Sequence, residues 1–182
     1  MNKSEIRKLI KQRKNNLSDE ARRLAAKRVF DYVESTDVFA NAEHVLVYHS
    51  LPDELSTLGF IDEWHSRKRL YLPRVNGDDL EILPYDAELL NKGAFNIAEP
   101  QGGNVVDVAK MDLIIVPGVA FDSKGNRIGR GKGFYDRLLS RADAMTIGVC
   151  YQCQIYDEMT TDSFDIPLDY VISESGIIKM PH

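Results

Sequence analysis

The residues that decide the fold are Asp-Leu-Ile-Ile-Val-Pro-Gly at positions 112–118. Such a nearly continuous apolar run is expected of a strand buried on both faces of a parallel sheet. Shorter apolar and β-branched runs predict further strands at 44–49, at 69–72 (stopped by Pro73), at 146–150 and at 170–173, with an edge strand at 80–86. The stretch 93–103 is rich in Gly and Pro, and we expect it to form a loop.

Helical spacing separates these strands. Apolar residues recur every three or four positions in 6–10 and 24–33, and Ser18 followed by two acids marks a helix start. Ser56 or Thr57 can cap another helix that buries Leu58, Ile61 and Trp64, and a further helix follows residue 133. Strands that alternate with helices predict an α/β fold, a three-layer α/β/α single domain over residues 1–182 with a mostly parallel sheet.

Composition and charge restrict the class of protein. The chain has 182 residues, a formal net charge of −5 and 43% hydrophobic residues. The acidic balance argues against a general affinity for nucleic acid, where a basic surface is expected. No apolar run approaches the roughly 20 residues that a membrane helix needs, and the charged first residues lack the apolar core of a signal peptide. We therefore expect a cytoplasmic protein with no nucleic-acid or membrane partner.

Two cysteines, Cys150 and Cys153, have the spacing C-x-x-C. A redox pair usually lies where a helix begins, whereas these follow a predicted strand, and a zinc site would need a second pair. We expect two thiols in or near the core.

A glycine-rich cationic segment follows the buried strand, where open α/β sheets place their ligands. Residues 117–136 read PGVAFDSKGNRIGRGKGFYD. Glycines let a ligand approach backbone N–H groups, and the three cations between them could hold phosphate oxygens at a helix N-terminus. The segment is not a Walker A loop, because G-K-[ST] is missing. By spacing alone, a flexible surface loop with solvated charges is an equally good interpretation.

Asp136 lies in the first turn of the helix that follows this segment. An acid at that place is favoured by the helix dipole, which gives it a purely structural explanation. It is also suited to nucleotide-bound Mg²⁺, which usually takes one or two carboxylates and phosphate oxygens.

The same segment resembles the 5-formyltetrahydrofolate cyclo-ligase family, whose signature runs roughly P-G-x-x-F-D-x-x-G-x-R-[LI]-G-x-G-x-G-[YF]-Y-D. Supporting fragments extend the resemblance over most of the chain: residues 3–7, YHSLPDELST at 48–57, YLPRV at 71–75, Ala-Glu-Pro at 98–100 and Asp169 before the last predicted strand. The resemblance implies a fold related to the sugar-phosphate isomerase and CoA-transferase group. It also implies ATP-dependent, Mg²⁺-dependent conversion of 5-formyltetrahydrofolate to 5,10-methenyltetrahydrofolate by a monomer whose partners are small molecules.

The resemblance further implies roles for particular residues. Arg130 and Lys132 are the expected catalytic residues, and Asp136 and Asp169 the expected Mg²⁺ ligands. The expected ATP contacts are Lys3, Ser4, Glu5, Ile6, Arg7, Arg127, Ile128, Gly129, Arg130, Gly131, Lys132, Gly133, Phe134 and Tyr135. The expected folate contacts are His49, Glu54, Arg130, Gly131, Lys132, Gly133 and Phe134.

Two other classes of protein remain open from the sequence. One is a folate- or nucleotide-binding paralogue without turnover, and the intact set of cations and acids argues against it. The other is a sugar-phosphate or acyl-CoA enzyme of related fold, which would need a catalytic acid on a different loop.

Overall fold

The computed structural model describes residues 1–92 and 98–181. The helices are α1 (Lys3–Asn15), α2 (Asp19–Glu34), α3 (Asp37–Asn41), α4 (Leu58–Trp64) and α5 (Phe134–Leu139), with short 3₁₀ helices at Ala87–Leu89, Val108–Lys110 and Gln152–Gln154. The strands are β1 (His44–Leu46), β2 (Arg69–Asn76), β3 (Asp79–Pro84), β4 (Leu90–Lys92), β5 (Ala98–Pro100), β6 (Leu113–Val116), β7 (Ala120–Phe121), β8 (Arg127–Ile128), β9 (Met145–Val149), β10 (Tyr170–Ser173) and β11 (Gly176–Lys179). None of the described helices is long and apolar enough to cross a bilayer.

The main sheet has the strand order β11-β10-β9-β6-β1-β2-β3 among the described residues. β1, β2, β6, β9 and β10 run parallel, and β3 and β11 pair antiparallel at the two edges. Strand β6, the apolar run on which the fold prediction depends, lies at the centre and is completely buried. The sheet is therefore mostly parallel, as predicted.

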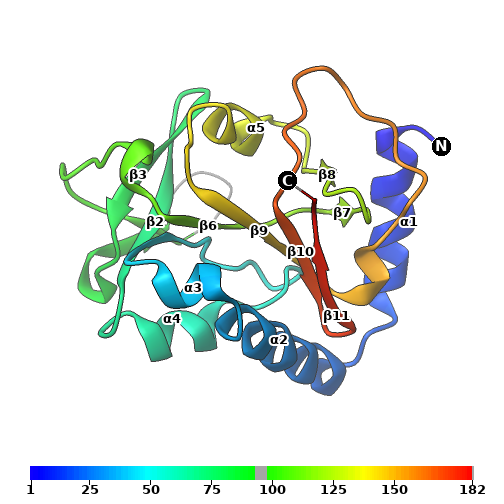
Figure 1. Ribbon diagram of the computed structural model, residues 1–182, viewed down its shortest axis with the longest axis horizontal. Helices are drawn as coiled ribbons and strands as arrows, with labels where there is room; N and C mark the ends of the chain where they lie inside the picture. The colour runs from blue at the N-terminus through cyan, green and yellow to red at the C-terminus, as the bar shows by residue number, and fades with distance from the viewer. Residues whose placement is uncertain (93–97, 182) are drawn as a thin grey trace.

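Helices cover both faces of this sheet. Figure 1 shows α2, α3 and α4 on one side and α5 on the other, with α1 beside β7 and β8. Side chains of β6 alternate between the two layers: Ile115 belongs to the core cluster that contains Val29 of α2, and Ile114 to the cluster that contains Leu138 of α5. The predicted α/β class with helices on both faces is confirmed.

Several local predictions need correction. Pro73 does not stop β2: the strand continues to Asn76, and Pro73 pairs with Ile82 beyond Tyr71, where pairing with β1 ends. Proline is tolerated at such a position because no strand on the β1 side needs its missing N–H. Leu58 is 47% exposed, whereas Ile61 is buried as predicted and Phe60 is buried with it.

The short strands were the least predictable elements. Ala98–Pro100, expected in a loop, forms β5 and pairs with β4, while residues 93–97 of the same predicted loop lie outside the described part of the chain. The hairpin β7–β8 and the edge strand β11 were not predicted. Two-residue strands carry too little periodicity to be recognised.

The hairpin β7–β8 begins the segment that forms the site. Its turn is closed by the buried Asp122, whose carboxylate accepts hydrogen bonds from the backbone N–H groups of Lys124 and Asn126, both at 2.9 Å. Gly125 has a φ of 84° and touches the backbone of Leu168, so a side chain does not fit there. This turn directs Arg127 and the following glycines back across the carboxyl end of β6.

Candidate active site at the carboxyl ends of the parallel strands

A cavity of about 530 Å³ lies where β1, β2 and β6 end. This volume is in the usual range for small-molecule sites. The lining comes from α1, from the loop after β1, from β2, from the segment that joins β8 to α5, and from residues near 162–165. Its charged members are Lys3, Arg7, Glu54, Glu99, Arg127, Arg130, Lys132, Asp136, Asp162 and Asp165.

Arg127 is a buried cation in the cavity wall. One terminal nitrogen donates to the carbonyl of Pro117 at 3.1 Å, and the other lies 3.3 Å from the Asp136 carboxylate. Its Nε is the buried side-chain atom without a hydrogen-bond partner among the described residues. Burial lowers the pKa of Arg127, although the Asp136 charge opposes this change. A buried guanidinium that is only partly compensated favours the arrival of an anion.

The segment 129–133 follows directly and keeps an open backbone. Gly131 and Gly133 have φ values of 109° and 72°, which other residues rarely adopt. Arg137 of α5 donates to the carbonyl of Lys132 at 2.9 Å and to that of Asp78 in the β2–β3 turn. Arg137 therefore ties this glycine-rich segment to the rigid edge of the sheet.

Helix α1 lies along the opposite side of the segment. Arg7 Nε donates to the carbonyl of Gly129 at 2.8 Å. Lys3, one helical turn earlier, pairs with Asp162 at 2.6 Å and with Asp165 at 3.0 Å. Both cations line the cavity, as the predicted nucleotide contacts should.

The residues between them do not belong to the cavity lining. Ile6 is completely buried in a core cluster, and Glu5 forms a capping box with Asn2. Ser4 is exposed and also lies outside the lining. Of the expected ATP contacts in residues 3–7, the structure thus places Lys3 and Arg7 at the cavity but not Ser4, Glu5 and Ile6, because only one face of a helix can meet a ligand.

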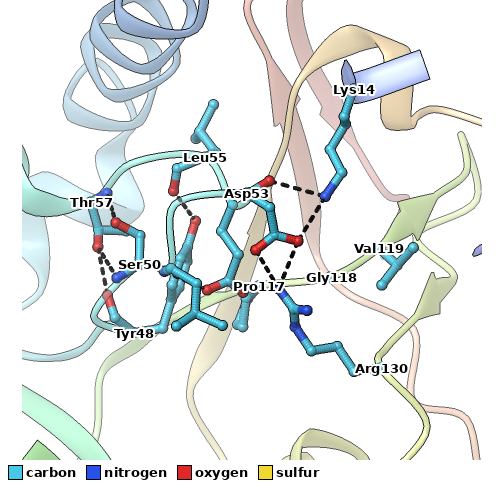
Figure 2. Close-up of polar contacts among 12 residues, drawn as sticks. Lys14, Tyr48, Ser50, Asp53, Leu55, Thr57, Pro117, Gly118, Val119 and Arg130 are labelled. Carbon is cyan, nitrogen blue, oxygen red and sulfur yellow. Dashed lines mark hydrogen bonds and ion pairs between the residues drawn. The ribbon is translucent and has the colours of Figure 1, made fainter. Parts of the chain in front are cut away.

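Asp53 joins two cations that come from different elements, as Figure 2 shows. Its carboxylate lies 2.9 Å from Arg130 and 3.4 Å from Lys14 of α1, and Lys14 Nζ also donates to the Asp53 carbonyl at 3.0 Å. Burial would raise the pKa of Asp53, but the Lys14 and Arg130 charges outweigh it and lower that pKa. No sequence pattern predicts this bridge, since Asp53 lies 39 positions from Lys14 and 77 from Arg130.

Glu54, the predicted folate-binding acid, is held by its own loop. One carboxylate oxygen accepts from the backbone N–H of Leu51 at 2.8 Å, and the other lies 3.8 Å from Arg130. Burial raises the pKa of Glu54, while the Leu51 N–H and the Arg130 charge oppose that change. Glu54 therefore lines the cavity as a poorly solvated carboxylate with a fixed orientation.

The hydroxyl of Thr57 holds the base of this loop instead of capping α4. It donates to the carbonyl of Tyr48 at 2.7 Å and accepts from the N–H of Ser50 at 3.1 Å (Figure 2). Thr57 makes no side-chain capping bond to α4, and the Ser56 hydroxyl accepts a long bond of 3.4 Å from Leu58. His49 lines the cavity beside this loop, and burial lowers its pKa.

Glu99 is a further acid of the cavity, which the sequence indicated only as part of a family fragment. It is 5% exposed, and its carboxylate accepts from the N–H of Val75 at 2.5 Å. Its position beside a proline in a glycine-rich stretch was the one local feature in the sequence that pointed to Glu99. The sequence did not indicate that the Glu99 side chain is buried. The cavity thus has Glu54 and Glu99 in its wall.

Asp169 lies outside this site. It immediately precedes β10, so it is at the amino ends of the parallel strands, whereas Asp136 lines the cavity at their carboxyl ends. Its carboxylate accepts from the N–H and the hydroxyl of Thr146, at 2.9 and 3.1 Å. The structure therefore does not bring Asp136 and Asp169, the two expected Mg²⁺ ligands, to the same edge of the sheet.

The two cysteines are free and lie apart from the cavity lining. Cys150 is buried and Cys153 half-buried, as expected of thiols in or near the core. Burial raises the pKa of both, so neither is prepared to act as a thiolate at neutral pH.

A ligand cavity at the carboxyl ends of parallel strands, with a glycine-rich cationic loop in its wall, defines an α/β enzyme that acts on small molecules. The model of the 5-formyltetrahydrofolate cyclo-ligase family matches residues 1–174. The chain belongs to this family, and it is a ligase.

Individual relatives agree with this assignment. The 5-formyltetrahydrofolate cyclo-ligase of Haemophilus influenzae is 31% identical over 176 residues, which cover 91% of this chain and 94% of the relative. The mouse protein of the same name is 32% identical over 188 residues, with coverage of 94% and 93%. The NMR structure of Aquifex aeolicus 5,10-methenyltetrahydrofolate synthetase is 36% identical, has a TM-score of 0.91 and covers 100% of this chain and 94% of its own.

Proposed function

We propose that this chain uses ATP and Mg²⁺ to convert 5-formyltetrahydrofolate into 5,10-methenyltetrahydrofolate, with release of ADP and phosphate. The relatives are named for the folate reaction, and the charged lining of the cavity supports binding of a nucleotide. The main evidence for a nucleotide is the buried guanidinium of Arg127, which lies at the start of an open glycine-rich segment. Its Nε has no hydrogen-bond partner among the described residues. Phosphate oxygens are the ligands that such a guanidinium and such a backbone bind best.

The cations around this segment can divide the triphosphate between them. Arg7 and Arg127 flank the glycines, and Arg130 and Lys132 lie between them. Phosphoryl transfer needs positioning and neutralisation of the phosphoryl oxygens more than it needs a protein nucleophile. We assign Arg130 and Lys132 to the transferred phosphoryl group, because Arg130 also approaches Glu54, the proposed folate contact.

Asp136 is the residue that would hold Mg²⁺. No three His, Cys, Asp or Glu side chains of the described residues are grouped as a metal site. A single carboxylate nevertheless suits Mg²⁺ bound to a nucleotide, since phosphate oxygens and water complete its coordination. The ion would supply further neutralisation of phosphoryl charge.

The folate reaction then has two balanced steps. The 5-formyl oxygen attacks the γ-phosphorus, the bond to the bridging oxygen breaks, and ADP leaves with the electron pair. The N10 nitrogen next attacks the formyl carbon and loses its proton, the carbon–oxygen bond breaks, and phosphate leaves. Glu54 is placed to orient the pterin, because a carboxylate can accept two neighbouring N–H donors.

Substitution of Lys132 tests this proposal. We expect Lys132→Ala to lower kcat by at least about 100-fold, because one charge is removed from the transition state. The assay mixes the protein with 5-formyltetrahydrofolate and Mg-ATP and follows methenyl absorbance in the near ultraviolet. Lys124→Ala is the matched control, since Lys124 is an exposed lysine of the same segment outside the cavity lining. Absence of product from the unaltered protein would refute the proposed function, and full activity of Lys132→Ala would refute the assigned role.

A further inference from the structure

Phe164 is an exposed aromatic ring at the cavity. Its relative exposure is 65%, the highest among the exposed large hydrophobic residues that the structure describes, yet it lines the cavity. Phe121, by comparison, is completely buried. A single exposed apolar side chain is ordinary, but an aromatic ring in a cavity wall offers a flat face on which a base can stack.

The ring is held in place by its neighbours. Asp162 and Asp165, two residues before it and one after it, both pair with Lys3 of α1. The Asp165 carboxylate also accepts from the backbone N–H of Asp162 at 2.7 Å, which closes the turn that contains Phe164. The Lys3 ammonium lies 5.8 Å from the ring centroid. Phe164 is therefore presented from a braced turn, although no helix or strand carries it.

Helix α1 gives the order of groups along the cavity. Its first residue, Lys3, contacts the turn that carries Phe164; Arg7, one turn later, contacts Gly129. Lys14 near its end contacts Asp53, which binds Arg130 beside Glu54. At 1.5 Å per residue, Lys3 and Lys14 are separated by about 16 Å along the helix. The glycine-rich segment thus lies between Phe164 on one side and Glu54 on the other.

The order of these groups along α1 indicates which end of the cavity holds the base and which holds the γ-phosphate. Phosphoryl transfer requires the γ-phosphate to face the folate, so the base must lie at the end of the cavity away from Glu54. The ribose separates the base from the phosphates, and one turn of α1 separates Arg7 from Lys3. From this geometry we propose that Phe164 is the base-binding residue of the site and stacks on the purine ring of the nucleotide. The inference rests on the proposed function, because it takes the glycine-rich segment as the phosphate site.

The test separates the base from the phosphates. Isothermal titration calorimetry measures binding of ATP, inorganic tripolyphosphate and 5-formyltetrahydrofolate, each with Mg²⁺ present, to the full chain and to its variants. We expect Phe164→Ala to weaken ATP binding about 10-fold or more, in line with the usual contribution of base–aromatic stacking. Binding of tripolyphosphate and of the folate should not change. Phe164→Trp should keep the ATP affinity, because it preserves a stacking surface, and Leu24→Ala, which truncates an exposed leucine of α2, is the matched control.

Each other outcome overturns the inference in a recognisable way. If ATP binds Phe164→Ala as tightly as the parent, no stacking occurs. If only folate binding falls, the ring belongs to the folate. If ATP and tripolyphosphate lose affinity equally, the substitution has displaced the phosphate loop. If the parent binds neither ATP nor tripolyphosphate, the proposed function fails as well.

Discussion

The Glu54 carboxylate shows how one residue can set the pH range of this enzyme. Burial raises its pKa above the ordinary value of 4.5, against the opposing effects of the Leu51 N–H and the Arg130 charge. At a pH below that raised value the group is protonated and loses part of its capacity to accept hydrogen bonds, on which the proposed contact with the pterin depends. A carboxylate at the surface would remain ionised to a lower pH.

We therefore expect an acid limb in the pH profile of kcat/KM for 5-formyltetrahydrofolate, with an apparent pKa above the ordinary value of 4.5. Glu54→Gln should lower kcat/KM and remove this limb, because the amide can still accept from the Leu51 N–H but does not titrate in this range. Glu63→Gln on α4 is the control and should leave the profile unchanged. An acid limb that persists in Glu54→Gln would show that another group titrates.

At the scale of elements, the turn into α5 depends on the backbone conformation of Gly133. Its φ is 72°, and a Cβ built there would lie 2.6 Å from a terminal nitrogen of Arg137. Arg137 donates a hydrogen bond to the Lys132 carbonyl. A side chain at position 133 would therefore strain the turn and also displace the arginine that stabilises it.

We expect Gly133→Ala to lower the free energy of unfolding by about 1–2 kcal/mol, the usual cost of a left-handed conformation for a residue with a Cβ. ATP binding should weaken in addition, because Arg137 no longer orders the loop. Gly176→Ala is the matched control: its φ is 142°, and a Cβ at this position, the first residue of β11, would meet no atom within 4 Å. Chemical denaturation measures the first effect and calorimetry the second. Equal ATP affinity in the two variants would contradict the role of Arg137 in ordering the loop.

Comparison of individual elements also shows which parts of the fold and site could be predicted from the sequence. The run at 112–118 and the glycine-rich segment are local patterns, and both predicted structures were found: β6 is central, and the segment lines the cavity. Asp53 and Phe164 could not be found in the same way, because their roles depend on contacts with α1 from distant positions. The sequence could not place Asp169 in space for a related reason. A motif match gives the order of residues along the chain, but the direction of β10 decides which edge of the sheet Asp169 occupies.

At the scale of the whole molecule, the site is built between α1 and the rest of the chain. Helix α1 supplies Lys3 and Arg7 to the lining, which α5 also joins, and α1 packs beside β7 and the 3₁₀ helix at Gln152–Gln154. α2 and α4 pack against the sheet face that carries the other core cluster. Ligand binding should therefore restrain α1 more than these two helices.

Hydrogen exchange measured by mass spectrometry checks this expectation. At an ATP concentration of about 100 times Kd, the bound state gains about 2.7 kcal/mol relative to states that cannot bind, so openings that disrupt the site become rarer. We expect slower exchange in α1, in residues 127–136 and in residues 157–168, and little change in α2. Tripolyphosphate serves as the comparison ligand. Protection confined to α2 and α4 would show that the nucleotide binds elsewhere.

The ion pairs of Lys3 with Asp162 and Asp165 join residues 159 and 162 positions apart. During synthesis of this chain, Lys3 leaves the ribosomal exit tunnel long before either aspartate has been added. The central strands can begin to assemble as they emerge, but α1 finds these partners only after residue 165 has been synthesised. Nascent chains that have not reached residue 165 should consequently bind nucleotide poorly, and longer ones should bind it well.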